Sequence, residues 1–100
     1  MDITYRTDKD ILYIAVEGRI DASNATAAEE KIFNIKKENP GKHVVVDADK
    51  LEYISSAGLR VILKAQKAMT AKGGMKLLHV NETIMEIFEI TGFSGILNIV

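Results

Sequence analysis

Two adjacent serines, Ser55 and Ser56, lie where an apolar segment passes into a stretch with helical periodicity. The backbone N–H groups of a first helical turn lack intrahelical partners and carry the positive end of the helix dipole, so either hydroxyl can cap the helix. A phosphoryl group at this position would be stabilised for the same reason. The pair is therefore a candidate phosphoacceptor site. Helix capping alone, which contributes about 1 kcal/mol, is the competing interpretation.

Basic residues follow the serines at helical spacing. Arg60 lies four residues after Ser56 on the same predicted helix face, and Lys64 and Lys67 continue the row. A phosphate on Ser56 would thus have a cation within reach. A solvated basic face explains the two lysines equally well, because such rows are common on exposed helices.

Other polar residues give weaker indications of chemistry. Asp47 and Asp49 end a short apolar strand, where α/β domains place ligand sites, and could bind a cation or activate a hydroxyl. The sequence supplies no third ligand for them, and neither His43 nor His79 has a neighbour at metal-ligand spacing. We therefore predict no metal site and expect both histidines to be structural or surface residues.

Enzymatic interpretations lack the necessary motifs. A serine hydrolase would need Gly-x-Ser-x-Gly, whereas the serines here precede Gly58. The glycines at 73–74 lead into a predicted strand rather than a helix, so they do not form a phosphate-binding loop. A small enzyme or nucleotide binder built around Asp47, Asp49 and Ser56 is an alternative. For this alternative the sequence supplies no general base, no set of metal ligands and no phosphate-binding loop. We expect a non-enzymatic protein with no catalytic residue and no cofactor.

Composition restricts the class of protein further. The 100 residues are 47% hydrophobic and 27% charged, which indicates one compact domain over residues 1–100. Lys+Arg 13 against Asp+Glu 14 gives a formal net charge of -1, so there is no basic field to hold nucleic acid or an anionic membrane. Charges interrupt every apolar run before it reaches membrane-spanning length, and the chain has no Cys. We predict a cytoplasmic protein without membrane insertion.

Apolar patterns predict the strands. Residues 3–7 and 11–16 are β-rich runs joined by a short polar link, typical of an antiparallel hairpin, and Gly18 is expected to end the second strand. The β-branched run 44–46 shows no alternation, so it should be a central strand covered on both faces. Residues 75–80 and 96–100 supply the later strands.

Three helices separate these strands. The first should begin at a cap, Asp21 or Ser23, and stop at Asn39-Pro40-Gly41. The second should end at Gly73-Gly74, and the third should run from a cap at Asn81 to Gly92. The second helix has an inward stripe of Leu59, Ile62, Leu63, Gln66 and Met69, and the third turns Ile84, Ile87 and Phe88 inward.

The order ββαβαβαβ implies an α/β fold with a mixed, largely parallel five-stranded sheet and helices packed against it. We expect the second and third helices to share one core with the central strand. This core should contain Leu59, Ile62, Val45 and Phe88.

The segment Tyr53-Ile54-Ser55-Ser56-Ala57-Gly58-Leu59-Arg60-Val61 resembles the signature of STAS domains, the bacterial anti-sigma factor antagonists. The resemblance covers essentially the whole chain, including Gly18-Arg19-Ile20-Asp21 and Gly92-Phe93. It implies the STAS fold. Aligning Gly58-Leu59 with the family's Gly-Leu pair places Ser56 at the phosphorylated position, with Ser55 as the alternative acceptor.

The resemblance also implies a function and partners. The unmodified protein would bind an anti-sigma factor and free a sigma factor, and phosphorylation would end this binding. In the family the anti-sigma factor is itself an ATP-dependent serine kinase, so ATP is the partner's cofactor, and a separate serine phosphatase restores the active form. We expect the free protein to be a monomer.

An acidic residue at the place of Asp21 lies near the family's phosphoserine, so Asp21 is a candidate surface residue as well as a candidate cap. The predicted partner-binding residues are Asp21, Ser55, Ser56, Ala57, Arg60 and Lys64.

The chain departs from the family in two places. Ser55 stands where members more often carry Asp, which favours an alternative function as a non-phosphorylated scaffold or sensor module in a larger regulatory or transport complex. The sequence ends at Val100, whereas many members add a C-terminal helix that packs against the sheet, so we expect a minimal domain.

Overall fold

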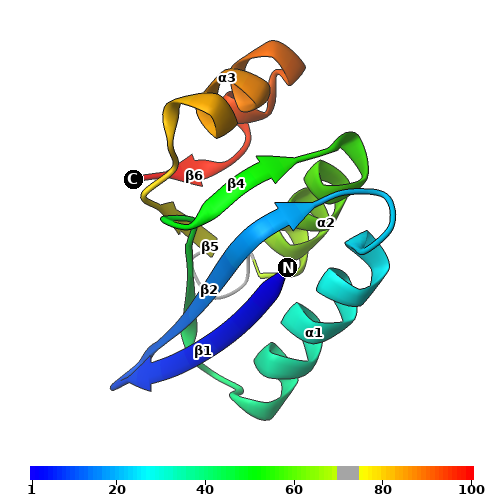
Figure 1. The fold of residues 1–100 in the computed structure, drawn as a ribbon. Coiled ribbons are helices and arrows are strands. Elements are labelled where there is room, and N and C mark those ends of the chain that lie inside the picture. Colours follow the sequence, from blue (N-terminus) through cyan, green and yellow to red (C-terminus); the bar gives the residue numbers. More distant parts are fainter. Residues whose placement is uncertain (70–74) are drawn as a thin grey trace.

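The computed structural model describes residues 1–69 and 75–100 (Figure 1). Six strands form a mixed sheet in the order β1-β2-β3-β5-β6, and β4 pairs with β2 off this path. The elements are β1 (Asp2–Asp8), β2 (Ile11–Ile20), α1 (Ala25–Glu38), β3 (His43–Asp47), β4 (Leu51–Ile54), α2 (Ser56–Ala68), β5 (Met75–Leu78), α3 (Glu82–Thr91), the short 3₁₀ helix η2 (Phe93–Gly95) and β6 (Asn98–Ile99).

The α/β class and the central place of β3 are confirmed, but the predicted count of five strands is wrong. The strand that the predicted order leaves out is β4, which pairs in parallel with the end of β2. This pairing is available because β2 does not end at Gly18, as predicted, but continues to Ile20. Gly18 has a φ of +88°, and the β2–β4 register shifts between Gly18 and Arg19. Glycine takes this conformation without steric cost, so the chain forms a bulge within the strand instead of a turn after it.

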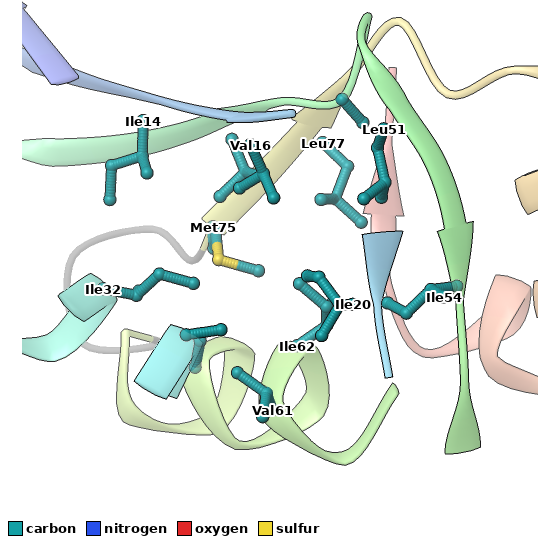
Figure 2. Close-up of a cluster of buried hydrophobic side chains, with 14 of the residues drawn as sticks. Ile14, Val16, Ile20, Ile32, Leu51, Ile54, Val61, Ile62, Met75 and Leu77 are labelled. Carbon is teal, nitrogen blue, oxygen red and sulfur yellow. The ribbon is translucent and has the colours of Figure 1, made fainter. Parts of the chain in front are cut away.

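The main core lies between the sheet and the α1–α2 pair (Figure 2), and the same cluster extends to Ile84 and Phe88 of α3. Side chains from the strands, such as Ile14 and Val16, face Ile32 of α1 and Ile62 of α2. Three members of the predicted core belong to this cluster, namely Leu59, Ile62 and Phe88.

Val45, the fourth predicted core residue, does not belong to this cluster. Its neighbours Val44 and Val46 are both in the cluster, and successive side chains of a strand point to opposite faces. Val45 therefore lies on the other face of the sheet, although it is buried there. An unalternating β-branched run shows that both faces are covered, but not which residue belongs to which face.

The helix ends agree with the predictions in part. The Asn81 side chain caps α3, and Gly92 ends it in the left-handed conformation, both as predicted. Neither Asp21 nor Ser23 caps α1, because the N-cap residue is Asn24 and it makes no side-chain capping bond. The predicted stop at Gly73-Gly74 lies outside the described residues. None of the described helices is both long enough and apolar enough to cross a membrane.

The inward stripe of α2 was only partly predicted. Leu59, Ile62 and Met69 are buried as expected, whereas Leu63 and Gln66 are half-buried. Val61 and Ala65 are buried in addition, because α1 packs along a second side of the helix. The third helix lies apart from this pair, against β4 and η2 (Figure 1).

Candidate functional site

The candidate site is the edge of the sheet where β2 and β4 both end. Ile20 and Ile54 are register partners in these parallel strands, and the Ser55 N–H donates to the Ile20 carbonyl at 2.8 Å. Asp21 and Ser55 follow these two residues directly, so they leave the sheet at the same edge. The carboxyl ends of parallel strands are where α/β domains place their binding sites.

Gly58 sets how closely the first turn of α2 approaches these strand ends. A Cβ on Gly58 would lie 2.7 Å from Ile54 Cγ1 and 2.8 Å from Ile20 Cγ2, closer than carbon atoms can pack. A larger residue would therefore push the helix start away from the sheet. The glycine of the signature segment thus fixes the position of the two serines.

The two serines have different environments. Ser55 is the N-cap residue of α2, and its Oγ accepts from the Gly58 N–H at 3.3 Å. Ser56 is the first helical residue and is exposed, and within the described chain its hydroxyl has no hydrogen-bond partner. Of the two serines that could cap the helix, Ser55 does so and Ser56 does not.

Asp21 organises the loop between β2 and α1. One of its carboxylate oxygens accepts from the Ser23 N–H at 2.9 Å and from the Ser23 hydroxyl. These bonds from Ser23 lower the pKa of Asp21, so the carboxylate is ionised at neutral pH. Asn24 closes the loop, since its side chain accepts from the Asp21 N–H and donates to the Arg19 carbonyl, each at 2.9 Å. The negative charge is thus held in place one residue beyond the end of β2.

Arg60 and Lys64, the first two residues of the predicted basic row, have different environments. The Lys64 ammonium lies 3.2 Å from the Glu29 carboxylate, which links α2 to α1. Arg60 is exposed and has no ion-pair partner among residues 1–69 and 75–100. Within this row, Arg60 is the side chain available to an anion at the start of α2.

A groove of about 310 Å³ lies between α1 and α2, and its lining includes Ala57, the residue after Ser56. It is lined by Ala25, Thr26, Glu29, Ala57, Arg60, Val61 and Lys64. Sequence reasoning had selected Ala57, Arg60 and Lys64, but it missed Thr26 and Glu29. Their contribution depends on how the two helices pack, which the spacing of residues within either helix does not reveal.

Sequence reasoning also missed a pair on the neighbouring strands. The Arg19 guanidinium lies 4.4 Å from the centre of the Tyr53 ring. The two residues are register partners that immediately precede Ile20 and Ile54. Tyr53 belongs to the signature segment, but nothing in the sequence indicates that β2 and β4 are neighbours.

The sequence left open whether Asp47 and Asp49 bind a cation, and in the structure Asp47 contacts His79 and the backbone of Asp49. Asp47 Oδ1 lies 2.9 Å from His79 Nδ1 and also accepts from the Asp49 N–H at 3.0 Å. The hydrogen bond to Asp47 raises the pKa of His79. Partial burial acts to raise the pKa of Asp47, but the hydrogen bonds from His79 and Asp49 outweigh it, so the pKa of Asp47 is lowered. In the described part of the chain no group of three or more His, Cys, Asp or Glu side chains could hold a metal ion.

The chain is similar to known proteins in sequence and in fold. Residues 2–100 match the family model of the STAS domain. A candidate anti-sigma factor antagonist of Bordetella bronchiseptica, BtrV, is 32% identical over 97 residues, which are 96% of this chain and 83% of BtrV. The crystal structure of an anti-sigma factor antagonist from Mycobacterium paratuberculosis superposes with a TM-score of 0.86 at 18% identity, over 98% of this chain and 83% of that one.

A second structural match has been solved in two states. The anti-sigma factor antagonist SpoIIAA, a Bacillus protein, superposes in its unphosphorylated form with a TM-score of 0.77 at 16% identity, over 99% of this chain and 88% of that one. The phosphorylated form gives 0.70 at 16% identity, over 99% and 91%. Both likenesses concern the fold. The family match over residues 2–100 shows that the chain belongs to the STAS domain family.

Proposed function

We propose that this STAS-domain protein is an anti-sigma factor antagonist, a binding protein that is switched off by phosphorylation of Ser56. The unmodified form binds an anti-sigma factor that is also an ATP-dependent serine kinase, and thereby frees a sigma factor. A serine phosphatase restores the active form. The observation that carries the proposal is the exposed Ser56 hydroxyl at the first position of α2.

Several properties of the site support Ser56 rather than Ser55 as the acceptor. The Ser55 hydroxyl is half-buried and bonded to the Gly58 N–H, so a kinase would have to break this cap to reach it. Ser56 needs no such change. The first turn of α2 contains no acidic residue, so a phosphate there would meet the positive end of the helix dipole without a competing carboxylate in the same turn.

The same surface offers features that a partner protein can recognise. The groove between α1 and α2 is lined by the basic residue Arg60 and by the Lys64–Glu29 ion pair. The ionised Asp21 lies at the neighbouring strand end. A phosphate adds about -1.5 to -2 charge, which introduces repulsion and a desolvation cost at any interface that covers Ser56.

Phosphate transfer tests the acceptor directly. The protein is incubated with ATP and an anti-sigma factor kinase from the same genome, and the site is mapped by mass spectrometry. We expect one phosphate on Ser56, no incorporation into Ser56→Ala, and retained incorporation into Ser55→Ala. Equal phosphorylation of Ser56→Ala and the native chain would show that the assignment is wrong and would make Ser55 the acceptor.

The alternative is a non-phosphorylated scaffold or sensor module that uses the same surface. It is favoured by Ser55, which replaces the Asp more common in the family. It predicts stable binding to a larger complex and no incorporation of phosphate at either serine, so the same experiment separates the two functions.

A further inference from the structure

The outer edge of β1 is an exposed edge of the sheet (Figure 1). Within the described residues β1 pairs only with β2, and its register runs without a break from Asp2 opposite Glu17 to Asp8 opposite Ile11. The N–H and C=O groups on its other side are therefore available to another strand. Natural edges are usually protected by shortness, proline or a bulge, and β6 at the opposite edge is only two residues long. β1 has seven residues, no proline and an unbroken register, and the charged side chains that can also protect an edge are arranged on β1 so that they complement a second copy of the strand.

The charges on β1 match one another in a single antiparallel register. If two copies of the strand pair about a twofold axis at Thr4, Asp2 of each copy lies opposite Arg6 of the other, and Ile3 lies opposite Tyr5. Because such an interface is isologous, each favourable pair forms twice. The neighbouring register, centred on Tyr5, would instead place Asp2 opposite Asp8, and like charges directly opposite each other are destabilising.

The side-chain faces of β1 suit this register. Ile3 and Tyr5 lie opposite Val16 and Ile14 of β2, so they point to the helix-covered face of the sheet. Tyr5 is 47% exposed there although its neighbour Ile3 is buried. An open groove of about 490 Å³ runs between the strand and α1, and it is lined by Ile3, Thr4, Tyr5, Lys31, Asn34, Ile35 and Glu38. In the paired register, Tyr5 of the second copy lies beside Ile3 over this groove.

The opposite face carries the charges. Arg6 lies with its guanidinium 4.0 Å from the centre of the Tyr13 ring, which is its register partner on β2. This contact holds the side chain over the sheet surface, where Asp2 of a second strand would reach it. The charge of Arg6 helps to lower the pKa of Asp47, but Arg6 forms no ion pair within the described chain, so its guanidinium can still pair with a carboxylate of a second copy.

We propose that the protein associates with a second copy of itself through antiparallel pairing of the two β1 strands, centred on Thr4, to give one continuous sheet. The occupant of the edge is a second copy rather than another protein because the strand is complementary to itself in charge and in apolar pairing. This proposal replaces the expectation of a monomer and does not depend on the phosphorylation switch.

Charge swaps test the register. The chain is prepared without an N-terminal tag, because β1 begins at residue 2, and self-association is measured by sedimentation equilibrium over a range of concentrations. Asp2→Arg alone and Arg6→Asp alone each create two like-charge pairs, and we expect each to raise the dimer dissociation constant by about tenfold or more. An equimolar mixture of the two variants pairs arginines with aspartates in both positions. We expect the mixture to associate within about threefold of the native affinity.

Two controls separate pairing from other effects of charge. Glu86→Arg makes the same change in net charge as Asp2→Arg on an exposed position of α3, and it should leave self-association unchanged. Circular dichroism should show that all variants keep the native fold. Sedimentation as a monomer at every concentration would overturn the proposal. So would a native dimer that both single variants leave intact, or a mixture of variants that does not associate.

Discussion

The helices α2 and α3 begin in nearly the same way, and the differences between their first turns isolate what is particular to the candidate site. Both have an N-cap side chain that accepts from the N–H three residues later, namely Ser55 in α2 and Asn81 in α3. The first helical residue is Ser56 in one and Glu82 in the other. The helix dipole stabilises a negative charge at this position, and α3 always carries such a charge on Glu82.

This comparison shows that α2 has the position for a negative charge but a neutral hydroxyl in it. Phosphorylation of Ser56 would give α2 the kind of charge that α3 already has in Glu82. The fold should therefore tolerate the modification, while a bound partner would not. The third helical residues differ as well, since Gly58 of α2 has no side chain whereas Ile84 of α3 is fully buried.

The largest change in stability is expected at the third position of α3. Ile84→Ala removes a side chain with 0% exposure and should cost about 2 to 5 kcal/mol of unfolding free energy. Urea unfolding followed by circular dichroism measures this cost. A loss below about 0.5 kcal/mol, the range of exposed positions, would show that α3 does not anchor to the core.

Gly58→Ala tests the close approach of α2 with the opposite kind of change. The added methyl group meets Ile20 and Ile54, so we expect a loss of about 1 to 3 kcal/mol in urea unfolding and a displaced helix start. The displacement should also slow phosphorylation of Ser56. Gly95→Ala serves as a control, since nothing lies within 4 Å of its added Cβ. Equal stability of the two variants would show that the close approach of α2 to the strand ends does not require a glycine at position 58.

The two caps should differ in strength. The Asn81 side chain accepts from the Ile84 N–H at 2.9 Å and also donates to the Leu51 carbonyl at 2.9 Å, whereas the Ser55 bond is 3.3 Å long. Asn81→Ala should thus cost more than Ser55→Ala, within a range of about 0.5 to 2 kcal/mol. Thermal unfolding of both variants under the same conditions gives the order. A reversed order would mean that Ser55 contributes more to the site than its cap geometry indicates.

The smallest effects are expected at the first helical position. Ser56→Glu should leave stability unchanged or raise it by up to about 1 kcal/mol, because the carboxylate meets the helix dipole. Glu82→Ser, the reciprocal change in α3, should lower stability by a similar small amount. Chemical denaturation at low ionic strength measures both changes. Marked destabilisation by Ser56→Glu would show that a charge at this position disrupts the fold itself.

Most of the helices and strands could be predicted from the sequence, but their pairing and packing could not. Cap and stop residues such as Asn81 and Gly92 act locally, so they could be recognised from their neighbours in the sequence. The strand β4 and the continuation of β2 depend on a pairing between distant residues. A glycine within a strand and a glycine after a strand look alike in one sequence, so Gly18 did not reveal that β2 continues and pairs with β4.

The same distinction applies to the site. The candidate residues around Ser56 were found from their spacing, whereas the groove needed the packing of α1 on α2. The Lys64–Glu29 ion pair shows the consequence, because it divides a basic row that appeared uniform in the sequence. Which of two adjacent serines caps the helix also required the structure, since a shift of one residue in the start of α2 exchanges their roles.

Calorimetric titration of the cognate anti-sigma factor with native and Ser56-phosphorylated protein tests the central claim most directly. Circular dichroism of the same samples should show that the fold is retained. We predict that the phosphorylated form binds at least about 100-fold more weakly and that Ser56→Ala binds like the native protein. Equal affinities of the native and phosphorylated forms would contradict partner switching at Ser56.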